Sequence, residues 1–223
     1  RLVQDIVDLS RLQVADTLRA PQLVDVGPVV AEAVDRCRVR ANAQQAELTV
    51  DDDSGVGDTR VYGDADLLVT AVKNLVDNAL SYSAPGSPVA VRTGVDGGLV
   101  SIAVSDHGVG IPEAEQARIF ERFYRVDPAR SRSTGGTGLG LAVVKHVCMN
   151  HGGEVVVRSE PGVGSTFTIR LPVASAEVRT PQPATAEDVT VGRREAQPGS
   201  GQVSTDASVP TSGLGMPVTQ AAS

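Results

Sequence analysis

The chain has no tryptophan, and its 223 residues include only three phenylalanines and three tyrosines. Basic residues are also in the minority, with 20 Lys and Arg against 27 Asp and Glu, which gives a formal net charge of -7. A surface that binds nucleic acid needs a basic stripe and aromatic rings on which bases stack. The composition therefore predicts that nucleic acid is not a partner.

Cysteines and long apolar runs are equally scarce. Cys37 and Cys148 are the only cysteines, and each lies in an apolar-periodic stretch, so we expect buried free thiols rather than a disulfide or a metal site. No run approaches the roughly 20 apolar residues of a membrane span, and no signal-peptide pattern opens the sequence. The chain starts at Arg1, without Met and inside an apolar-periodic run, which favours a fragment of a longer protein.

Apolar periodicity and composition divide the chain into three parts. Residues 1–20 contain an amphipathic helix at 1–13, residues 21–173 form the domain that buries a core, and residues 174–223 have the polar composition of a disordered tail. Within the domain the patterns predict, in order, a strand at 23–26, a helix at 28–45, a strand at 48–50, turns at 51–58, a helix at 64–82, strands at 89–94 and 99–105, a short helix at 112–120, a helix at 141–150, and strands at 154–159 and 165–171.

The helix at 64–82 carries the first segment with a chemical signal, KNLVDNALSYS at 73–83. Asn74 and Asn78 are four residues apart and therefore share one face of this helix, beside the apolar stripe. Two neutral amide oxygens on one face are suited to holding Mg²⁺ and its waters against phosphates. A solvated polar face explains the same pattern, and this segment alone does not separate the two interpretations.

The second segment is VSIAVSDHGVGI at 100–111, in which Asp106 ends an alternating strand and two glycines follow. A carboxylate at a strand end can accept a hydrogen bond from an exocyclic amine, and Gly108 and Gly110 let backbone approach a planar ring closely. An ordinary Asp-Gly turn at the end of a strand is the alternative.

The third segment, GGTGLGLAVVKH at 135–146, is a glycine cluster that leads straight into a helix. Backbone N–H groups freed by glycine, together with a helix N-terminus, form a cradle for polyphosphate. The dinucleotide fingerprint G-x-G-x-x-G fails because Leu141 stands at the third glycine position, and the sequence contains no Walker motif. A flexible hinge is the remaining alternative for this segment.

The fourth segment, IFERFYRVD at 119–127, places Phe120, Phe123 and Tyr124 beside Arg122 and Arg125, and Arg130 and Arg132 follow. Arginines on a loop over a phosphate site can pair with the γ-phosphate. The aromatic residues are equally suited to anchoring a loop to the core, and the two roles are compatible.

In chain order, these segments and EPGVGSTF at 160–167 resemble the N box, first glycine box, F box, second glycine box and third glycine box of bacterial sensor histidine kinases. RLVQDIVDLSRL at 1–12 resembles the end of that family's dimerisation domain, and the stretch at 119–141 is most similar to actinobacterial kinases of the phosphate-responsive PhoR type. The resemblance implies a two-layer α/β sandwich of the Bergerat (GHKL ATPase) type. Such a fold has a mixed sheet with helices on one face and a flexible ATP lid between the first and second glycine boxes.

The resemblance also implies roles for individual residues. Asn78 would hold Mg²⁺, Asn74 would lie at the phosphates, and Asp106 would receive the adenine amine, while Arg122 and Arg125 would approach the γ-phosphate or the acceptor helix. Asn74, Arg122 and Arg125 are thus the expected catalytic residues. The remaining residues expected to contact ATP are Tyr82, Gly108, Gly110, Ile111 and Thr166 around the base, and Gly136, Thr137, Gly138, Leu139 and Gly140 around the triphosphate.

The family's activity would transfer the ATP γ-phosphoryl group to a histidine on an upstream dimerisation helix, for relay to an aspartate of a response regulator. The chain's own His107, His146 and His151 lack the pattern of a phosphoacceptor, so we expect local structural roles for them. By the same resemblance, the intact protein would be a homodimer, and this part would be a cytoplasmic domain tied to the cell membrane only through upstream segments.

One departure from the family concerns Ser81, which occupies a position that is often basic in relatives, so a phosphate contact is either missing or supplied by Lys73 or a lid arginine. Three alternatives also remain. The first, a serine-kinase anti-sigma factor, is disfavoured by the F box and the helix at 1–13. The second, a conformational ATPase of the topoisomerase or mismatch-repair sort, is disfavoured because Lys73 or Asn74 holds the slot of its catalytic glutamate. The third is an ATP-binding module without transfer activity.

Overall fold

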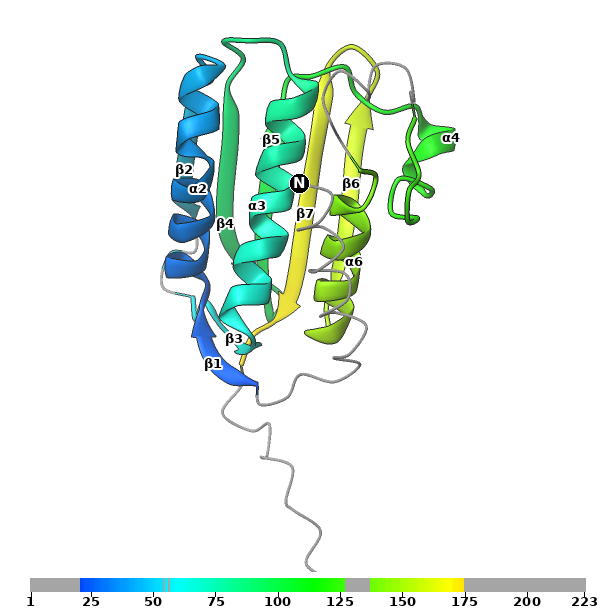
Figure 1. Cartoon of the computed structure of the whole chain (residues 1–223). Helices are drawn as coiled ribbons and strands as arrows, with labels where there is room; N and C mark the ends of the chain where they lie inside the picture. Colours follow the sequence, from blue (N-terminus) through cyan, green and yellow to red (C-terminus); the bar gives the residue numbers. More distant parts are fainter. Residues whose placement is uncertain (1–20, 54, 56, 127–136, 175–223) are drawn as a thin grey trace, which may run out of the picture. The chain divides into compact units, whose positions relative to one another are not determined.

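The computed structural model describes residues 21–174, except 54, 56 and 127–136, and contains a mixed five-stranded sheet with helices on one face (Figure 1). The predicted helix at 1–13 and the predicted tail lie outside the described residues, apart from Ala174. The strands are β1 (Gln22–Asp25), β2 (Leu48–Asp53), β3 (Arg60–Gly63), β4 (Val89–Asp96), β5 (Leu99–Asp106), β6 (Glu154–Glu160) and β7 (Gly164–Pro172). The helices are α2 (Val26–Ala43), α3 (Ala65–Tyr82), α4 (Glu113–Gln116) and α6 (Gly140–Asn150).

The large sheet has the strand order β2-β4-β5-β7-β6, and β1 and β3 form a separate two-stranded sheet. The pairing of β2 with β4 is parallel and the other pairings are antiparallel. Helices α2, α3 and α6 lie across one face of the large sheet in Figure 1, with α3 between the other two. This arrangement confirms the predicted two-layer α/β sandwich with a mixed sheet.

Helix α3 confirms its prediction closely because both its start signal and its apolar stripe are local. The Asp64 side chain caps the helix by accepting hydrogen bonds from the backbone N–H groups of Asp66 and Leu67. The predicted core face is buried throughout; its members are Leu68, Ala71, Val72, Leu75 and Ala79. The two cysteines are buried on the helices next to α3 and form no disulfide, as predicted.

Two predicted boundaries are wrong, and one strand was not predicted. Helix α2 begins at Val26, because the Asp25 side chain accepts from the Gly27 N–H at 3.1 Å and caps the helix before the predicted start. The helix predicted at 112–120 is only the single turn α4. The four-residue strand β3 was not predicted, since its support is non-local: it pairs with β1, and the Ala174 N–H donates to the Arg60 carbonyl oxygen at 2.7 Å.

The turn predicted at 51–58 is also wrong in its first part, because β2 runs through Asp53. Aspartate is depleted in strands in general, but β2 is an edge strand, where charged side chains are favoured. Arg92 donates to the Asp51 carboxylate at 3.4 Å, and the Thr93 hydroxyl donates to that of Asp52 at 2.9 Å. These partners on β4 accommodate the acidic run within the sheet.

His151 ties the end of α6 to the start of α3, which is the local structural role predicted for it. Its Nδ1 lies 2.8 Å from the Val147 carbonyl oxygen, and its Nε2 accepts a hydrogen bond from the Asp64 N–H at 3.0 Å. Gly63 packs so tightly against the imidazole that a Cβ there has no room. Burial lowers the pKa of His151 below the usual 6.5, so the neutral ring is the form that this arrangement holds.

Candidate functional site

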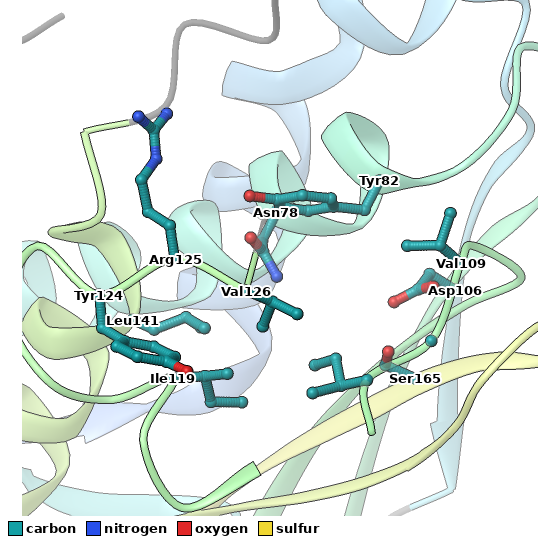
Figure 2. Close-up of a pocket in the computed structure, with 12 residues that line it drawn as sticks. Asn78, Tyr82, Asp106, Val109, Ile119, Tyr124, Arg125, Val126, Leu141 and Ser165 are labelled. Atoms are coloured by element: carbon teal, nitrogen blue, oxygen red, sulfur yellow. The ribbon is translucent and has the colours of Figure 1, made fainter. Parts of the chain in front are cut away.

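A cavity of about 230 Å³ opens between the C-terminal half of α3, the end of β5 and the segment that follows α4 (Figure 2). This volume is several times that of one water molecule, ~30 Å³, so the cavity is large enough for part of a ligand. The lining residues are Asn78, Tyr82, Asp106, Val109, Gly110, Ile111, Ile119, Tyr124, Arg125, Val126, Leu141 and Ser165. The cavity therefore brings together parts of all four chemical segments and of EPGVGSTF at 160–167.

Asp106 supplies the carboxylate of this cavity from the C-terminal end of β5. Its side chain is buried, and its Oδ1 accepts a hydrogen bond from the Gly108 N–H at 2.8 Å, with a further one from the Ser165 backbone. Burial raises the pKa of Asp106, although the two backbone hydrogen bonds and the nearby His107 oppose that rise. Figure 2 shows Asp106 beside Ser165 at one wall, where it can accept a hydrogen bond from a ligand.

The glycines after Asp106 are required by close packing. A Cβ on Gly108 would lie 2.5 Å from the Tyr82 carbonyl oxygen, and Gly110 has φ +67 and no room for a Cβ beside the Glu160 carbonyl group. The loop is further fixed by Ile111, whose N–H donates to the Ser159 hydroxyl at 2.8 Å. These contacts make the Asp106 wall of the cavity rigid.

The two asparagines of α3 face different neighbours. Asn78 lines the cavity and appears in Figure 2 between Tyr82 and Val126. Asn74 is not among the lining residues, and its side chain lies against Gly140 at the start of α6, where an added Cβ would be 3.8 Å from the Asn74 amide oxygen. Both residues are half-buried. Asn78 thus faces the cavity, and Asn74 lies beside the N-terminus of α6.

A backbone hydrogen bond connects the two ends of the predicted lid that the structure describes. The Phe123 N–H donates to the Gly138 carbonyl oxygen at 2.9 Å, and the Leu139 N–H donates to the Thr137 hydroxyl at 3.3 Å. Phe120 packs edge-on against Phe167, with ring centroids 6.4 Å apart, and so anchors this segment to the core. Gly136, Arg130 and Arg132 lie outside the described residues.

The two predicted catalytic arginines differ in position. Arg125 lines the cavity, and Figure 2 shows it on the side opposite Asp106. Arg122 is exposed and is not among the lining residues. The sequence did not predict that Ile119, Tyr124 and Val126 form a wall of the cavity. The Tyr124 ring, whose centroid lies 4.3 Å from the Arg118 guanidinium carbon, closes the cavity at this wall.

Thr166 was predicted near the base; it is not among the residues that line the cavity, whereas its neighbour Ser165 is. In β7 the buried Phe167 fixes which side chains face the helices, and strand alternation gives Ser165 the same face as Phe167 and the opposite face to Thr166. Ser165 pairs with Asp106 in register and lines the cavity. The Thr166 hydroxyl is 2.9 Å from the hydroxyl of Ser105. Alternation around the large apolar Phe167 is the signal that identifies Ser165.

Next to the asparagines, a charged cluster joins α3 to α2. The Asp77 carboxylate accepts from Lys73 Nζ at 2.7 Å and from Arg40 Nη1 at 2.8 Å. Arg40 also donates through Nη2 to the Ser81 hydroxyl at 2.8 Å. Burial opposes ionisation of Asp77, but the hydrogen bonds and charges of Lys73 and Arg40 outweigh it, so the pKa of Asp77 is lowered.

The chemistry of the donors fits Mg²⁺ bound together with a polyphosphate. Within the described part of the chain, no group of three or more His, Cys, Asp or Glu residues is placed to hold a metal. An amide oxygen such as that of Asn78 is a suitable single protein ligand when phosphate oxygens and waters complete the shell.

None of the helices among the described residues is long and apolar enough to cross a membrane.

Comparisons with known proteins agree with this geometry. A family model described as "Histidine kinase-, DNA gyrase B-, and HSP90-like ATPase" matches residues 63–175. The chain is 50% identical over 171 residues to the sensor-like histidine kinase SenX3 of Mycolicibacterium smegmatis, covering 77% of this chain and 44% of that protein. The chain thus spans less than half the length of this relative.

Solved structures give the same result. The mycobacterial sensor histidine kinase MprB matches with a TM-score of 0.58 and 35% identity, over 68% of this chain and 97% of the MprB chain. Full-length ShkA, solved in complex with AMPPNP, matches with a TM-score of 0.66 and 30% identity, over 78% of this chain and 36% of the ShkA chain.

Proposed function

The chain belongs to this ATPase family as the catalytic domain of a sensor histidine kinase, and we propose that it binds ATP with Mg²⁺ in the cavity described above. The observation that carries the proposal is the placement of Asp106 and Asn78 at one cavity, from β5 and α3 respectively. A buried acceptor at one end suits the amine of adenine, and an amide oxygen at the other suits a metal ion on phosphates.

In the proposed complex, different residues of the chain bind the base and the phosphates of the nucleotide. Asp106 accepts from the exocyclic amine of adenine, and the glycine-limited loop at 108–110 leaves room for the planar ring. Asn78 is the protein ligand of Mg²⁺, and Asn74 lies beside the phosphates at the start of α6, whose free N–H groups favour an anion. When bound, the metal ion supplies neutralisation of the charge on the phosphate oxygens.

The proposed reaction transfers the γ-phosphoryl group to a histidine of the upstream dimerisation helix. The imidazole nitrogen forms a bond to the γ-phosphorus, the bond from phosphorus to the bridging oxygen breaks, and ADP leaves. Phosphoryl transfer depends mainly on positioning and on neutralising charge, and Arg125 is the cation of this cavity suited to that task. Arg122, which is exposed, is the candidate for contact with the acceptor helix.

The partners follow from the same proposal. The phosphohistidine would pass its phosphoryl group to an aspartate of a response regulator. The intact protein would be a homodimer through its upstream helices, with this domain on the cytoplasmic side of a membrane sensor. The relay to a response regulator is supported by the name of the relative SenX3, which is a sensor-like histidine kinase.

The test is a transfer assay with γ-labelled ATP. The chain is incubated alone and then with the parent protein's upstream dimerisation helices. We expect no label on the chain alone, and label on the added helices that is lost in acid and kept in alkali, as for phosphohistidine. Acid-stable label on serine would support an anti-sigma kinase instead, and phosphate release without any acceptor would support a conformational ATPase.

A further inference from the structure

We propose that Arg40 is a specificity-determining residue of the nucleotide site. It supplies a positive charge at the last turn of α3 and so favours a phosphorylated nucleotide over the bare nucleoside. This inference rests on the proposed function, because it concerns the phosphate end of the same cavity. The sequence did not identify Arg40, which lies in the last turn of α2 and reaches α3 only through the fold.

The ligand-facing stripe of α3 carries no charge of its own. Asn74 and Asn78 are neutral, and the last turn of α3 contains no basic residue. The C-terminal end of a helix carries a partial negative charge, which disfavours a polyphosphate nearby. Lys73 is the basic residue next to the stripe, but its Nζ is held by the Asp77 carboxylate at 2.7 Å. A cation from another element therefore helps to hold a polyphosphate at this stripe, and Arg40 on α2 is a candidate in addition to Arg125.

Arg40 is fixed next to that stripe by three hydrogen bonds to α3. Its Nη1 donates to the Asp77 carboxylate at 2.8 Å and to the Asp77 carbonyl oxygen at 3.3 Å, and its Nη2 donates to the Ser81 hydroxyl at 2.8 Å. A quarter of its side chain remains exposed. The guanidinium is thus held in one orientation while part of it stays accessible.

Helix geometry places this guanidinium beside the two asparagines. An α-helix turns about 100° per residue, so Ser81, seven residues after Asn74, lies only about 20° from it around the helix axis. Ser81 is also within about one turn of Asn78, and a turn rises ~5.4 Å. A charge bonded to Ser81 therefore lies within the Debye length of ~10 Å at 0.1 M salt, where it acts on a phosphate bound at the stripe.

The charges in the cluster do not cancel. Asp77 carries one negative charge and is shared by Arg40 and Lys73, one on each carboxylate oxygen, which leaves the three residues with a net charge of about +1. The pKa of Asp77 is lowered, which keeps its carboxylate ionised and the cluster intact at neutral pH. Arg40 also joins α2 to α3, so the experiment must separate an effect on the ligand from an effect on packing.

The experiment compares R40Q with the matched variant R38Q in the full chain. Arg38 lies on the same helix, is exposed and pairs with Asp35 at 3.2 Å, so R38Q removes the same charge away from the cavity. Affinities for ATP and for adenosine are measured by displacement of a fluorescent ATP analogue. We expect R40Q to weaken ATP binding about three- to tenfold and to leave adenosine binding unchanged.

Salt and a rescue variant sharpen the result. The wild-type preference for ATP over adenosine should fall as salt rises, and R40Q should show less of this dependence. Adding S81K to R40Q restores a positive charge from α3 itself, and we expect it to recover most of the lost ATP affinity. Recovery by S81K is a result that a purely structural role of Arg40 would not produce.

Three outcomes would overturn the inference. ATP and adenosine affinities that fall together in R40Q, or an R40Q chain that binds ATP as the wild type does, would each show that Arg40 does not select phosphate. Failure of S81K to rescue a selective loss would show that the charge is not its cause. A wild-type chain that does not bind ATP would refute the proposed function as well, which distinguishes the two failures.

Discussion

Replacing Asp106 by asparagine tests the adenine end of the site with the smallest possible change of shape. The carboxylate accepts hydrogen bonds from the backbone of Gly108 and Ser165. An asparagine can keep one such bond only by turning its amide oxygen toward the backbone. Its NH₂ group then faces the base, where the amine of adenine is also a donor.

The expected loss follows from the bond that disappears. A hydrogen bond to a charged group contributes about 1.5–3 kcal/mol, which corresponds to a roughly 10- to 150-fold weaker affinity. Because two donors would then face each other at Asp106, we expect a loss in the upper half of this range. The change should be specific to the base, since Asn78 and the start of α6 are untouched.

The assay measures Kd for ATP and for GTP in D106N, with Asp96→Asn as the control. Asp96 is exposed at the end of β4, so its replacement by asparagine makes the same change of charge away from the cavity. The 6-oxo group of guanine is an acceptor, which suits the new NH₂ group, so the preference for ATP over GTP should shrink in D106N. A variant that binds ATP within about twofold of the wild type, or that loses ATP and GTP equally, would refute the role of Asp106.

Three further predictions concern the metal, the loop and the core. N78A should weaken ATP binding about tenfold in the presence of Mg²⁺ and much less in EDTA; equal losses in titrations under both conditions would count against a metal ligand. G110A should cost about 3 kcal/mol in urea unfolding, because φ is +67 and a Cβ meets the Glu160 carbonyl group. G97A, at φ +56 in open space, should cost only about 1 kcal/mol. Because the folded-state pKa of His151 lies below 6.5, its contribution to stability should be complete above pH 6.5 and be lost as the pH falls toward the folded pKa. Urea midpoints measured from pH 5 to 7.5 should show this slope, and H151F should reduce it.

Much of the fold was predictable because its signals are local. The limits of α3 follow from a capping aspartate and a helical apolar stripe, and the β4–β5 hairpin follows from alternation around Gly97 and Gly98. Strand β3 was missed because four residues carry little periodicity and their partners are in β1. The acidic half of β2 was missed because side chains on β4 stabilise it.

The site was predicted to different degrees at its two ends. Asp106 and Asn78 stand in segments with recognisable spacing, and both line the cavity. Thr166 does not line the cavity, because strand alternation puts Ser165 and not Thr166 on the face of β7 that carries the buried Phe167. The wall that includes Tyr124 depends on how the segment after α4 folds back over the cavity, and no local pattern specifies that path.

The positive charge beside Ser81 could not be predicted from the residue at that position alone. The sequence shows an uncharged residue at Ser81 and offers Lys73 as a substitute, but Asp77 holds Lys73 in place. The guanidinium that reaches Ser81 comes from Arg40, 41 residues earlier. Helices α2 and α3 lie side by side across the sheet, so the fold can deliver the charge from either helix. A residue that is neutral in sequence can therefore sit in a positively charged environment, and the variant S81K in the R40Q background asks whether the two sources of charge are equivalent.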